Sequence, residues 1–250
     1  MCEILTIKHN NKGVRFGKFD IKRAREDNPD GAGYIIFEKK GSKWFKYDFE
    51  TFGKPHYSNK HKKKDSKEVG GYCGDGYYTN WYKASVSDKD YCVNRIFSKQ
   101  FELKPKQMMI AHFRLSTSGH GLENTQPITK GAYTVIHNGV FGYGIRELPK
   151  NVSDTAQFTK TLKRLIYKLS NKGLKITPEV EKKAIEQLTE KVGGSFSMFI
   201  HSEKTGKIYY IKSAFTSFCN STDGFLGTTK STRLPLLYNE PEPKKILQVV

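Results

Sequence analysis

The chain has 250 residues and a mass of 28.6 kDa, and its 43 lysine and arginine residues outnumber its 25 aspartate and glutamate residues, which gives a formal net charge of +18. Aromatic residues make up 13% of the sequence, enough bulk for a packed core, and this excludes a chain that is disordered throughout. No apolar run approaches the roughly 18 residues that a membrane helix needs, and the N-terminus lacks the apolar stretch of a signal peptide. We therefore expect one globular domain over residues 1–250.

Cysteine usage indicates a reducing compartment. The cysteines are few and widely spaced, with no C-x-x-C pair, a pattern typical of a cytoplasmic protein without disulfides. Cys73 and Cys92 can be combined with His56 and His61 into a zinc-ligand set, but the spacings match no pattern of structural zinc sites. We expect neither a metal nor another cofactor. The four cysteines are Cys2, Cys73, Cys92 and Cys219.

The excess positive charge is strongest between residues 54 and 68, KPHYSNKHKKKDSKE. This stretch has no hydrophobic period, so we interpret it as a solvated insertion that could contact a protein partner, with weak non-specific binding of nucleic acid as the alternative. Strand and helix patterns fail over the whole of residues 53–94, where lysine, glycine and tyrosine dominate. We expect a long irregular surface segment or lid there.

Strand patterns occupy much of the first half of the chain. Residues 2–9 (CEILTIKH) alternate between apolar and polar side chains, which predicts a strand that begins at the N-terminus. Residues 28–47 open with Asn, Pro, Asp and Gly and continue as two aromatic-rich strands separated by a Lys-Gly pair, the pattern of a hairpin. Residues 107–117 and 131–141 each end in a polar tail, so two strands are expected to bring polar side chains to one place.

Two helices follow, and strands then return. Residues 154–170 place apolar side chains at helical spacing behind Ser153, a good N-cap residue. A second helix is expected to begin at Thr177 and Pro178, an N-cap followed by proline, and to end at a pair of glycines. Strands, then helices, then strands is the order of an α+β fold. The later strand segments are residues 195–213, 224–231 and 244–250.

Four short segments contain side chains of complementary chemistry: Cys2, residues 112–119 (HFRLSTSG), residues 137–139 (HNG) and residues 153–155 (SDT). Cleaving a carboxamide through a thioester needs a thiolate, a base for its proton, and donors for the oxyanion that forms. Holding a free amino acid also needs a cation for its carboxylate and an anion for its ammonium group. The four segments together supply these groups.

In order and in residue type, these segments resemble the class II glutamine amidotransferases, the cysteine branch of the N-terminal-nucleophile hydrolases. The resemblance includes Met1-Cys2, the loop Asn124-Thr-Gln-Pro127, the turn NPDGAGY at residues 28–34 and the segment at residues 193–213. It implies a four-layer αββα sandwich with two stacked antiparallel sheets, of the stand-alone single-domain type.

The resemblance also implies a role for each matching residue. Cys2 would be the nucleophile, and its own α-amine, freed by removal of Met1, would be the base. Asn138 and Gly139 would form the oxyanion hole through the side-chain amide and the backbone N–H. The substrate would be held by Arg114 and Thr117 at its α-carboxylate and by Asp154 at its α-ammonium group. His112 and His137 are left as structural residues beneath the site.

Each of these residues also has an ordinary structural explanation. Arg114 can be a surface charge at a strand end, Asn138 and Gly139 a tight turn, and Asp154 a first-turn charge favoured by the helix dipole. Three supporting positions depart from the usual pattern of the family. Glu3 stands where glycine is usual and could crowd the nucleophile, while Gln126 and Ala156 replace a histidine and a glutamate.

Hydrolysis of the glutamine side-chain amide to glutamate and ammonia, through a thioester intermediate, is the activity that the resemblance implies. No synthase domain is recognised within the sequence, so we expect a separate ammonia-accepting synthase as partner or simple hydrolysis of glutamine or a related amide. Two alternatives stay open. The same cysteine mechanism can act on a different amide, or the scaffold can be a catalytically silent basic binding protein.

Overall fold

The computed structural model describes residues 2–53, 71–72, 78–79, 89–119, 121–142, 151–230, 234, 238–243 and 245–249. The basic stretch at residues 54–68 and most of the irregular segment expected at residues 53–94 lie outside these ranges. In the described part of the chain, no helix is long and apolar enough to cross a membrane.

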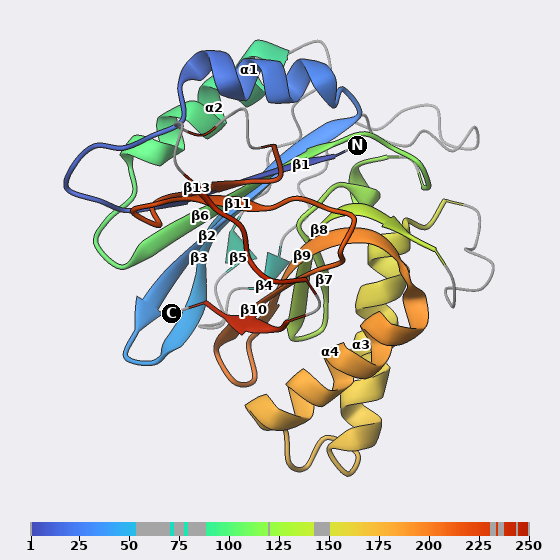
Figure 1. Ribbon diagram of the computed structural model, residues 1–250. Helices are drawn as coiled ribbons and strands as arrows, with labels where there is room; N and C mark the ends of the chain where they lie inside the picture. The colour runs from blue at the N-terminus through green and yellow to red at the C-terminus, as the bar shows by residue number, and fades with distance from the viewer. Residues whose placement is uncertain are drawn as a thin grey trace.

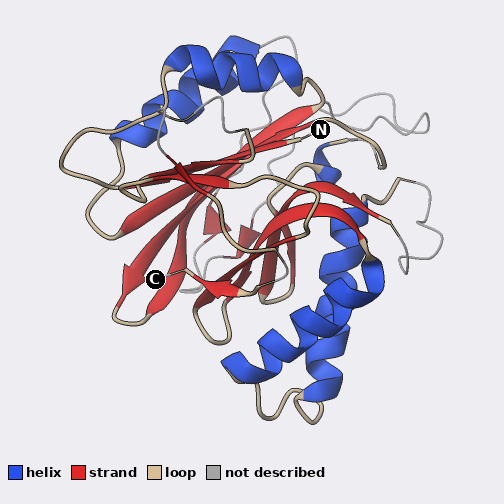
Figure 2. Ribbon diagram, in the orientation of Figure 1, coloured by secondary structure: helices blue, strands red, loops and turns tan. Residues whose placement is uncertain are grey.

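Two antiparallel sheets, stacked face to face, form the centre of the structure (Figures 1 and 2). The seven-stranded sheet has the order β13-β11-β12-β1-β6-β2-β3. Its first four strands in the sequence are β1 (Glu3–Lys8), β2 (Gly31–Lys40), β3 (Lys43–Gly53) and β6 (Gln107–Arg114). The last three are β11 (Cys219–Ser221), β12 (Leu226–Thr228) and β13 (Tyr238–Asn239).

The five-stranded sheet has the order β14-β10-β9-β8-β7. Its strands are β7 (Ile128–Lys130), β8 (Tyr133–Phe141), β9 (Gly194–Ser202), β10 (Lys207–Lys212) and β14 (Leu247–Gln248). The two short strands β4 (Gly71–Tyr72) and β5 (Tyr78–Thr79) pair with each other, and a 3₁₀ turn, η1, spans Leu122–Asn124.

A pair of helices covers the outer face of each sheet, which gives the four-layer αββα order of the predicted fold class (Figure 2). Helices α1 (Lys18–Asp27) and α2 (Lys89–Phe101) pack on the seven-stranded sheet, and α3 (Asp154–Leu169) and α4 (Pro178–Val192) on the five-stranded sheet (Figure 1). Both predicted helices are confirmed, including the side chains of Ser153 and Thr177 as N-caps.

The core is divided into three apolar clusters, one for each interface between neighbouring layers. Strand β1 shows the division most clearly, because successive side chains of a strand point to opposite faces. Leu5 and Ile7 pack with α1 and α2, whereas Ile4 packs between the two sheets with residues such as Ile110 and Phe199. The third cluster joins α3 and α4 to the five-stranded sheet. The layers therefore depend on alternating apolar positions in the central strands.

Helices α1 and α2 are absent from the sequence-based prediction, and α2 begins inside the segment expected to be irregular. Helix α1 has the sequence KFDIKRARED, and its buried apolar residues are Ile21 and Ala24 alone. An apolar stripe this narrow does not stand out as a helical period. The helix is stabilised instead by its contacts with α2 and β6, which only the tertiary fold provides.

A buried carboxylate anchors α4 to the sheet. Glu181 is 1% exposed, and it accepts hydrogen bonds from the hydroxyls of Ser202, Thr205 (2.6 Å) and Tyr209 (2.7 Å). Burial beside this carboxylate raises the pKa of Tyr209. Because the carboxylate is buried, it is the acceptor to which all three hydroxyls donate in place of water.

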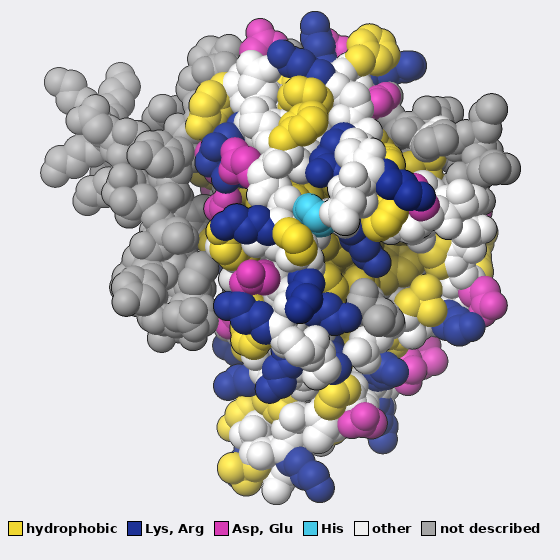
Figure 3. Space-filling model, turned by 90° about the vertical axis from the view of Figure 1, so that its left-hand side faces the viewer, with side chains coloured by type: hydrophobic (Ala, Val, Ile, Leu, Met, Phe, Trp, Pro, Cys, Tyr) yellow, Lys and Arg dark blue, Asp and Glu magenta, His cyan; other side chains and the backbone are white. Residues whose placement is uncertain are grey.

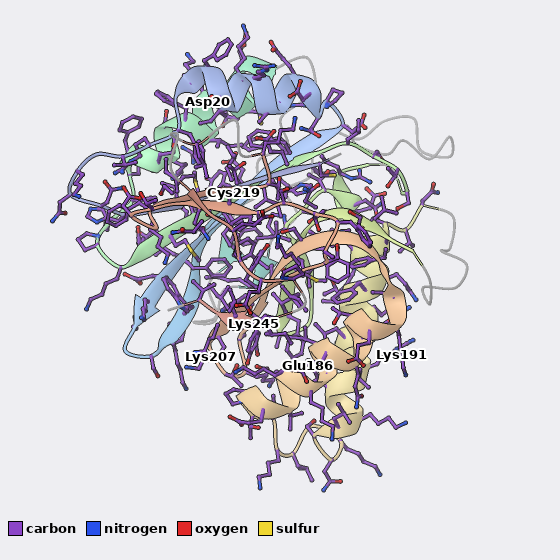
Figure 4. The ribbon with its side chains drawn as sticks, viewed as in Figure 1. Asp20, Glu186, Lys191, Lys207, Cys219 and Lys245 are labelled. Carbon is purple, nitrogen blue, oxygen red and sulfur yellow. The ribbon has the colours of Figure 1, made fainter. Side chains whose placement is uncertain are left out.

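We expect the substitution Glu181→Ala to lower the free energy of unfolding by about 2–5 kcal/mol, because it leaves three buried hydroxyls without their acceptor. Urea unfolding followed by circular dichroism measures the loss. The control is Glu186→Ala on the exposed side of the same helix (Figure 4), where a change within about 0.5 kcal/mol is expected. Equal losses for the two variants would contradict the role of this network.

Candidate active site

Cys2 lies at the start of β1, beside the end of β6. The two strands pair with Glu3 opposite Phe113, so residue 2 is brought next to Arg114 and Leu115. The thiol donates to the carbonyl oxygen of Leu115 over 3.4 Å, and the Leu115 N–H donates to the sulfur over 3.4 Å. One backbone residue therefore holds the sulfur atom in place.

The surroundings of Cys2 keep its thiol protonated at rest. Burial raises the pKa of the Cys2 thiol and is the largest effect, and the nearby negative charge of Asp154 raises it further. The Leu115 N–H, the Arg114 guanidinium and the positive charge of the N-terminus act in the opposite direction, but the pKa remains above its ordinary value. A nucleophilic role for this thiol therefore requires a base to remove its proton.

Glu3 does not point towards the side of the strand on which Cys2 lies. Its side chain is fully buried, and Lys230 Nζ lies 3.5 Å from its Oε2 atom. Since strand side chains alternate, Glu3 shares the helix-facing side of β1 with Leu5, whereas Ile4 faces the other sheet. The crowding expected from the sequence is therefore avoided by the direction of the side chain.

Arg114, the last residue of β6, is 4% exposed. Its Nη2 atom donates to the backbone carbonyls of Ser118, at 2.8 Å, and Gly119. Burial lowers the pKa of Arg114, while the charges of Cys2 and Asp154, among others, raise it. Two hydrogen bonds to backbone carbonyls thus orient the guanidinium, which lies close enough to Cys2 and Asp154 to interact with both charges.

The turn after β6 packs against the start of α3. Gly119 has a φ of +59°, and a Cβ atom there would lie 2.6 Å from the backbone nitrogen of Ser153, so only glycine fits. The hydroxyl of Ser118 accepts a hydrogen bond from the Asp154 N–H over 3.3 Å. Thr117, in contrast, is exposed on this turn, so its predicted support of a carboxylate stays a prediction.

Asp154 is the first residue of α3, and its half-buried carboxylate connects the helix to β8. It accepts hydrogen bonds from the backbone N–H groups of Thr155 (2.7 Å) and Phe141 (3.4 Å). The loop before the helix is fixed by Asn124, whose side chain accepts from the Ser153 N–H at 2.7 Å and donates to the Asn151 carbonyl at 2.8 Å.

Asn138 and Gly139 lie near the end of β8, which contacts β1. Asn138 is 4% exposed, and its side-chain oxygen has no hydrogen-bond partner among the described residues. Gly139 has a φ of +124°, and a Cβ atom at this position would lie only 1.9 Å from the carbonyl oxygen of Ser195 on β9. The backbone here is extended and paired rather than turned, so the tight turn considered from the sequence is wrong.

Gln126 holds the backbone that precedes these two residues. Its side-chain oxygen accepts from the His137 N–H, and its Nε2 atom donates to the His137 carbonyl over 2.9 Å and to the Thr155 hydroxyl over 3.2 Å. His112 reaches the same carbonyl from the other sheet, with an Nε2 to oxygen distance of 3.1 Å. The sequence marks Gln126 only as a departure from a family pattern, and its bonding is visible only in the folded chain.

Both histidines are buried and neutral. Burial lowers the pKa of His112 to about 3 and that of His137 to about 4. His137 Nδ1 lies 3.1 Å from the Thr155 hydroxyl, and its ring stacks on Phe141 with the centroids 4.1 Å apart. These contacts fit the structural role expected for both residues. No group of acidic, cysteine or histidine side chains in the described ranges is arranged to hold a metal ion.

The structure thus brings together residues that are far apart in the sequence. The charges of Arg114 and Asp154 both act on Cys2, and Asp154 also acts on His137, next to Asn138. The other described cysteines, Cys92 and Cys219, are free and buried in different parts of the core.

Comparison with known proteins shows the fold. No protein-family model and no curated protein sequence matches the chain. The glutamine phosphoribosylpyrophosphate amidotransferase of B. subtilis, complexed with ADP and GMP, is 14% identical with a TM-score of 0.50, over 99% of this chain and 47% of that one. The allosteric regulatory enzyme of purine biosynthesis is 15% identical with a TM-score of 0.55, over 99% and 46%.

This chain therefore spans about half the length of those two enzymes. A predicted glutamine amidotransferase from Pseudomonas aeruginosa PA01 is 12% identical with a TM-score of 0.38, over 99% of this chain and 92% of that one. The first two likenesses confirm the fold class, and at the level of the fold they confirm the resemblance to class II glutamine amidotransferases.

Gly139→Ala tests the close approach of β8 to β9. We expect this variant to lose at least about 3 kcal/mol of the free energy of unfolding, because a methyl group would overlap the Ser195 carbonyl. The control is Gly224→Ala, where φ is +71° but no atom lies within 4 Å of the added Cβ, and a loss of about 1 kcal/mol is expected. Urea unfolding of both variants measures the difference, and similar losses would show that the approach is unimportant.

Proposed function

We propose that this protein is a glutamine amidotransferase-like amidohydrolase, which uses Cys2 to hydrolyse the side-chain amide of glutamine to glutamate and ammonia. The observation that supports it most is the convergence of Cys2, Arg114 and Asp154 into one electrostatic group beside Asn138 and Gly139. Residues separated by more than 100 positions meet there, on a fold shared with a glutamine phosphoribosylpyrophosphate amidotransferase.

In this proposal the α-amine of Cys2 is the base that activates the Cys2 thiol. Removal of Met1 gives Cys2 a free α-amine, with an ordinary pKa of about 7.7–8.0, which accepts the thiol proton near neutral pH. A base on the same residue is needed because burial raises the pKa of the thiol. His112 and His137 are poor candidates for this base, because burial lowers the pKa of His112 to about 3 and that of His137 to about 4.

Arg114 and Asp154 hold the two charged groups of the substrate. Arginine has five N–H donors, and two bonds of Arg114 are made by one nitrogen, Nη2, to backbone carbonyls. Its other donors form no hydrogen bond with the described residues and can pair with the α-carboxylate of glutamine, with Thr117 assisting at the exposed rim. The Asp154 carboxylate accepts the α-ammonium group. Both charges are oriented by backbone contacts before substrate arrives.

The thiolate attacks the amide carbon, and the oxyanion that forms accepts hydrogen bonds from the Asn138 amide and the Gly139 N–H. The C–N bond then breaks, and the α-ammonium group of Cys2 returns the proton to the leaving ammonia. Water hydrolyses the thioester, which releases glutamate and restores the thiol. Gln126 acts as a positioning residue, because its bonds to both backbone groups of His137 fix the strand just before Asn138. The ammonia passes to a separate synthase or to solvent.

Alkylation by 6-diazo-5-oxo-norleucine, a diazoketone that mimics glutamine, tests the nucleophile. We expect the intact mass to show loss of Met1 and one adduct, and peptide mapping to place that adduct on Cys2, with no adduct in Cys2→Ser. Cys92 and Cys219 are internal controls, because burial raises the pKa of both thiols. A retained Met1, or a folded protein with Cys2 unmodified, would contradict the proposal.

Arg114→Lys tests recognition of the substrate carboxylate. We expect KM for glutamine to rise about 10–100-fold, because lysine cannot form a bidentate pair with a carboxylate. The control is Lys99→Arg on α2, where Lys99 pairs with Asp48 and Glu102, and no change in KM is expected. Arg114 does not bind the carboxylate if Arg114→Lys raises KM equally for glutamine and for a substrate without the α-carboxylate, or if the Arg114→Lys and Lys99→Arg variants have the same KM. In either case a different amide becomes the better candidate substrate.

A further inference from the structure

A cavity lies between the two sheets, at the end of the layer away from Cys2. Its volume is about 410 Å³, within the range of sites for small molecules. Lys8, at the opposite end of β1 from Cys2, is one of its lining residues. Six residues of extended strand span about 20 Å, and none of Cys2, Arg114 and Asp154 lines this cavity. It is therefore distinct from the candidate active site.

The floor of the cavity is apolar and largely aromatic. Met108 contributes from β6, while Phe199, Tyr210 and Phe218 form a cluster with ring centroids 4.8–5.3 Å apart. The same side chains belong to the core between the sheets. The cavity is thus a place where this core is open at its edge, and a flat apolar group would continue its packing. The rim is polar and includes Asn220, Thr222 and Gln248.

The positive charge of Lys8 has no acidic partner among the described residues, and the carboxylate of Glu240, which acts on the lining residue Tyr210, is paired with Lys212. Lys8 is half-buried, and no lining residue is acidic. Burial and the neighbouring charge of Lys39 both lower the pKa of Lys8, so the two cations are close enough to repel. Neither lysine forms an ion pair with a carboxylate of the described residues, and Lys39 lies instead over the ring of Trp44, 5.8 Å from its centroid. An anion at Lys8 would relieve this repulsion.

The cavity is lined by the ends of strands from both sheets, including Lys8 of β1, Asn239 of β13 and Gln248 of β14. Figure 3 shows one side of the molecule, with lysine and arginine side chains spread over it and an apolar recess right of centre. An apolar floor beside Lys8, which forms no ion pair with the described residues, is the surface expected of a site for an amphiphilic anion rather than of a closed core.

We propose that this cavity binds a small molecule with a flat apolar body and one anionic group, which pairs with Lys8. The aromatic floor selects the body, and Lys8, which has no acidic partner among the described residues, attracts the anion. Carboxylate and phosphate share the required charge, so the proposal covers both. The site does not depend on the glutaminase activity proposed above.

The probes for a direct test are 1-naphthoate, 1-naphthyl phosphate and the neutral 1-naphthalenemethanol, each titrated into the full chain by isothermal calorimetry. We expect one saturable site for at least one of the two anions and binding at least about tenfold weaker for the neutral probe. Lys8→Met should abolish that difference. Lys191→Met removes the same charge from the exposed side of α4 (Figure 4) and should bind like the unaltered protein.

A second measurement does not depend on a variant. The preferred anionic probe should slow acetylation of Lys8 by an N-hydroxysuccinimide ester, followed by peptide mass spectrometry, while acetylation of Lys191 proceeds unchanged. Absence of saturable binding by both anions would overturn the proposal. Equal affinity of the anions for the Lys8→Met and unaltered proteins, or no protection of Lys8, would also overturn it.

Discussion

The backbone pairing of β1 with β6 positions the N-terminal residue of the candidate site. Glu3 lies opposite Phe113, so Cys2 lies beside Arg114 at the end of β6, and two contacts with Leu115 hold its sulfur atom. The alternation of β1 then directs Ile4 towards the other sheet and Glu3 towards the helices. A shift of one residue in this pairing would exchange those faces, so the register of one strand pair determines both the core and the environment of the thiol.

Contacts between layers position the remaining groups. Gln126 and His112 bond the same carbonyl of β8 from different elements, and Gly139 allows β8 to approach β9 closely. Gln126 forms these bonds although the family pattern has a histidine there, because an amide offers both a donor and an acceptor to one backbone unit. The site therefore depends on backbone geometry more than on the identity of each supporting side chain.

The layer between the sheets differs at its two ends. At one end lie Cys2 and the charged residues around it, at about the length of β1 from the open cavity beside Lys8. Sheets that twist against each other separate towards their corners, and side chains of ordinary size do not fill the gap that results. The same packing that closes the centre of the sandwich thus leaves an apolar recess at its edge.

The sequence alone was sufficient for the longer strands along the chain, for helices α3 and α4, and for the four segments that the structure brings together, because wide apolar stripes and short polar motifs are local features. The order of the strands within each sheet was not predicted. Helices α1 and α2, the exposed position of Thr117, the direction of Glu3 and the bonds of Gln126 were decided only by the tertiary structure. Narrow apolar faces and single polar side chains contact distant segments of the chain. The sequence around them therefore does not indicate those contacts.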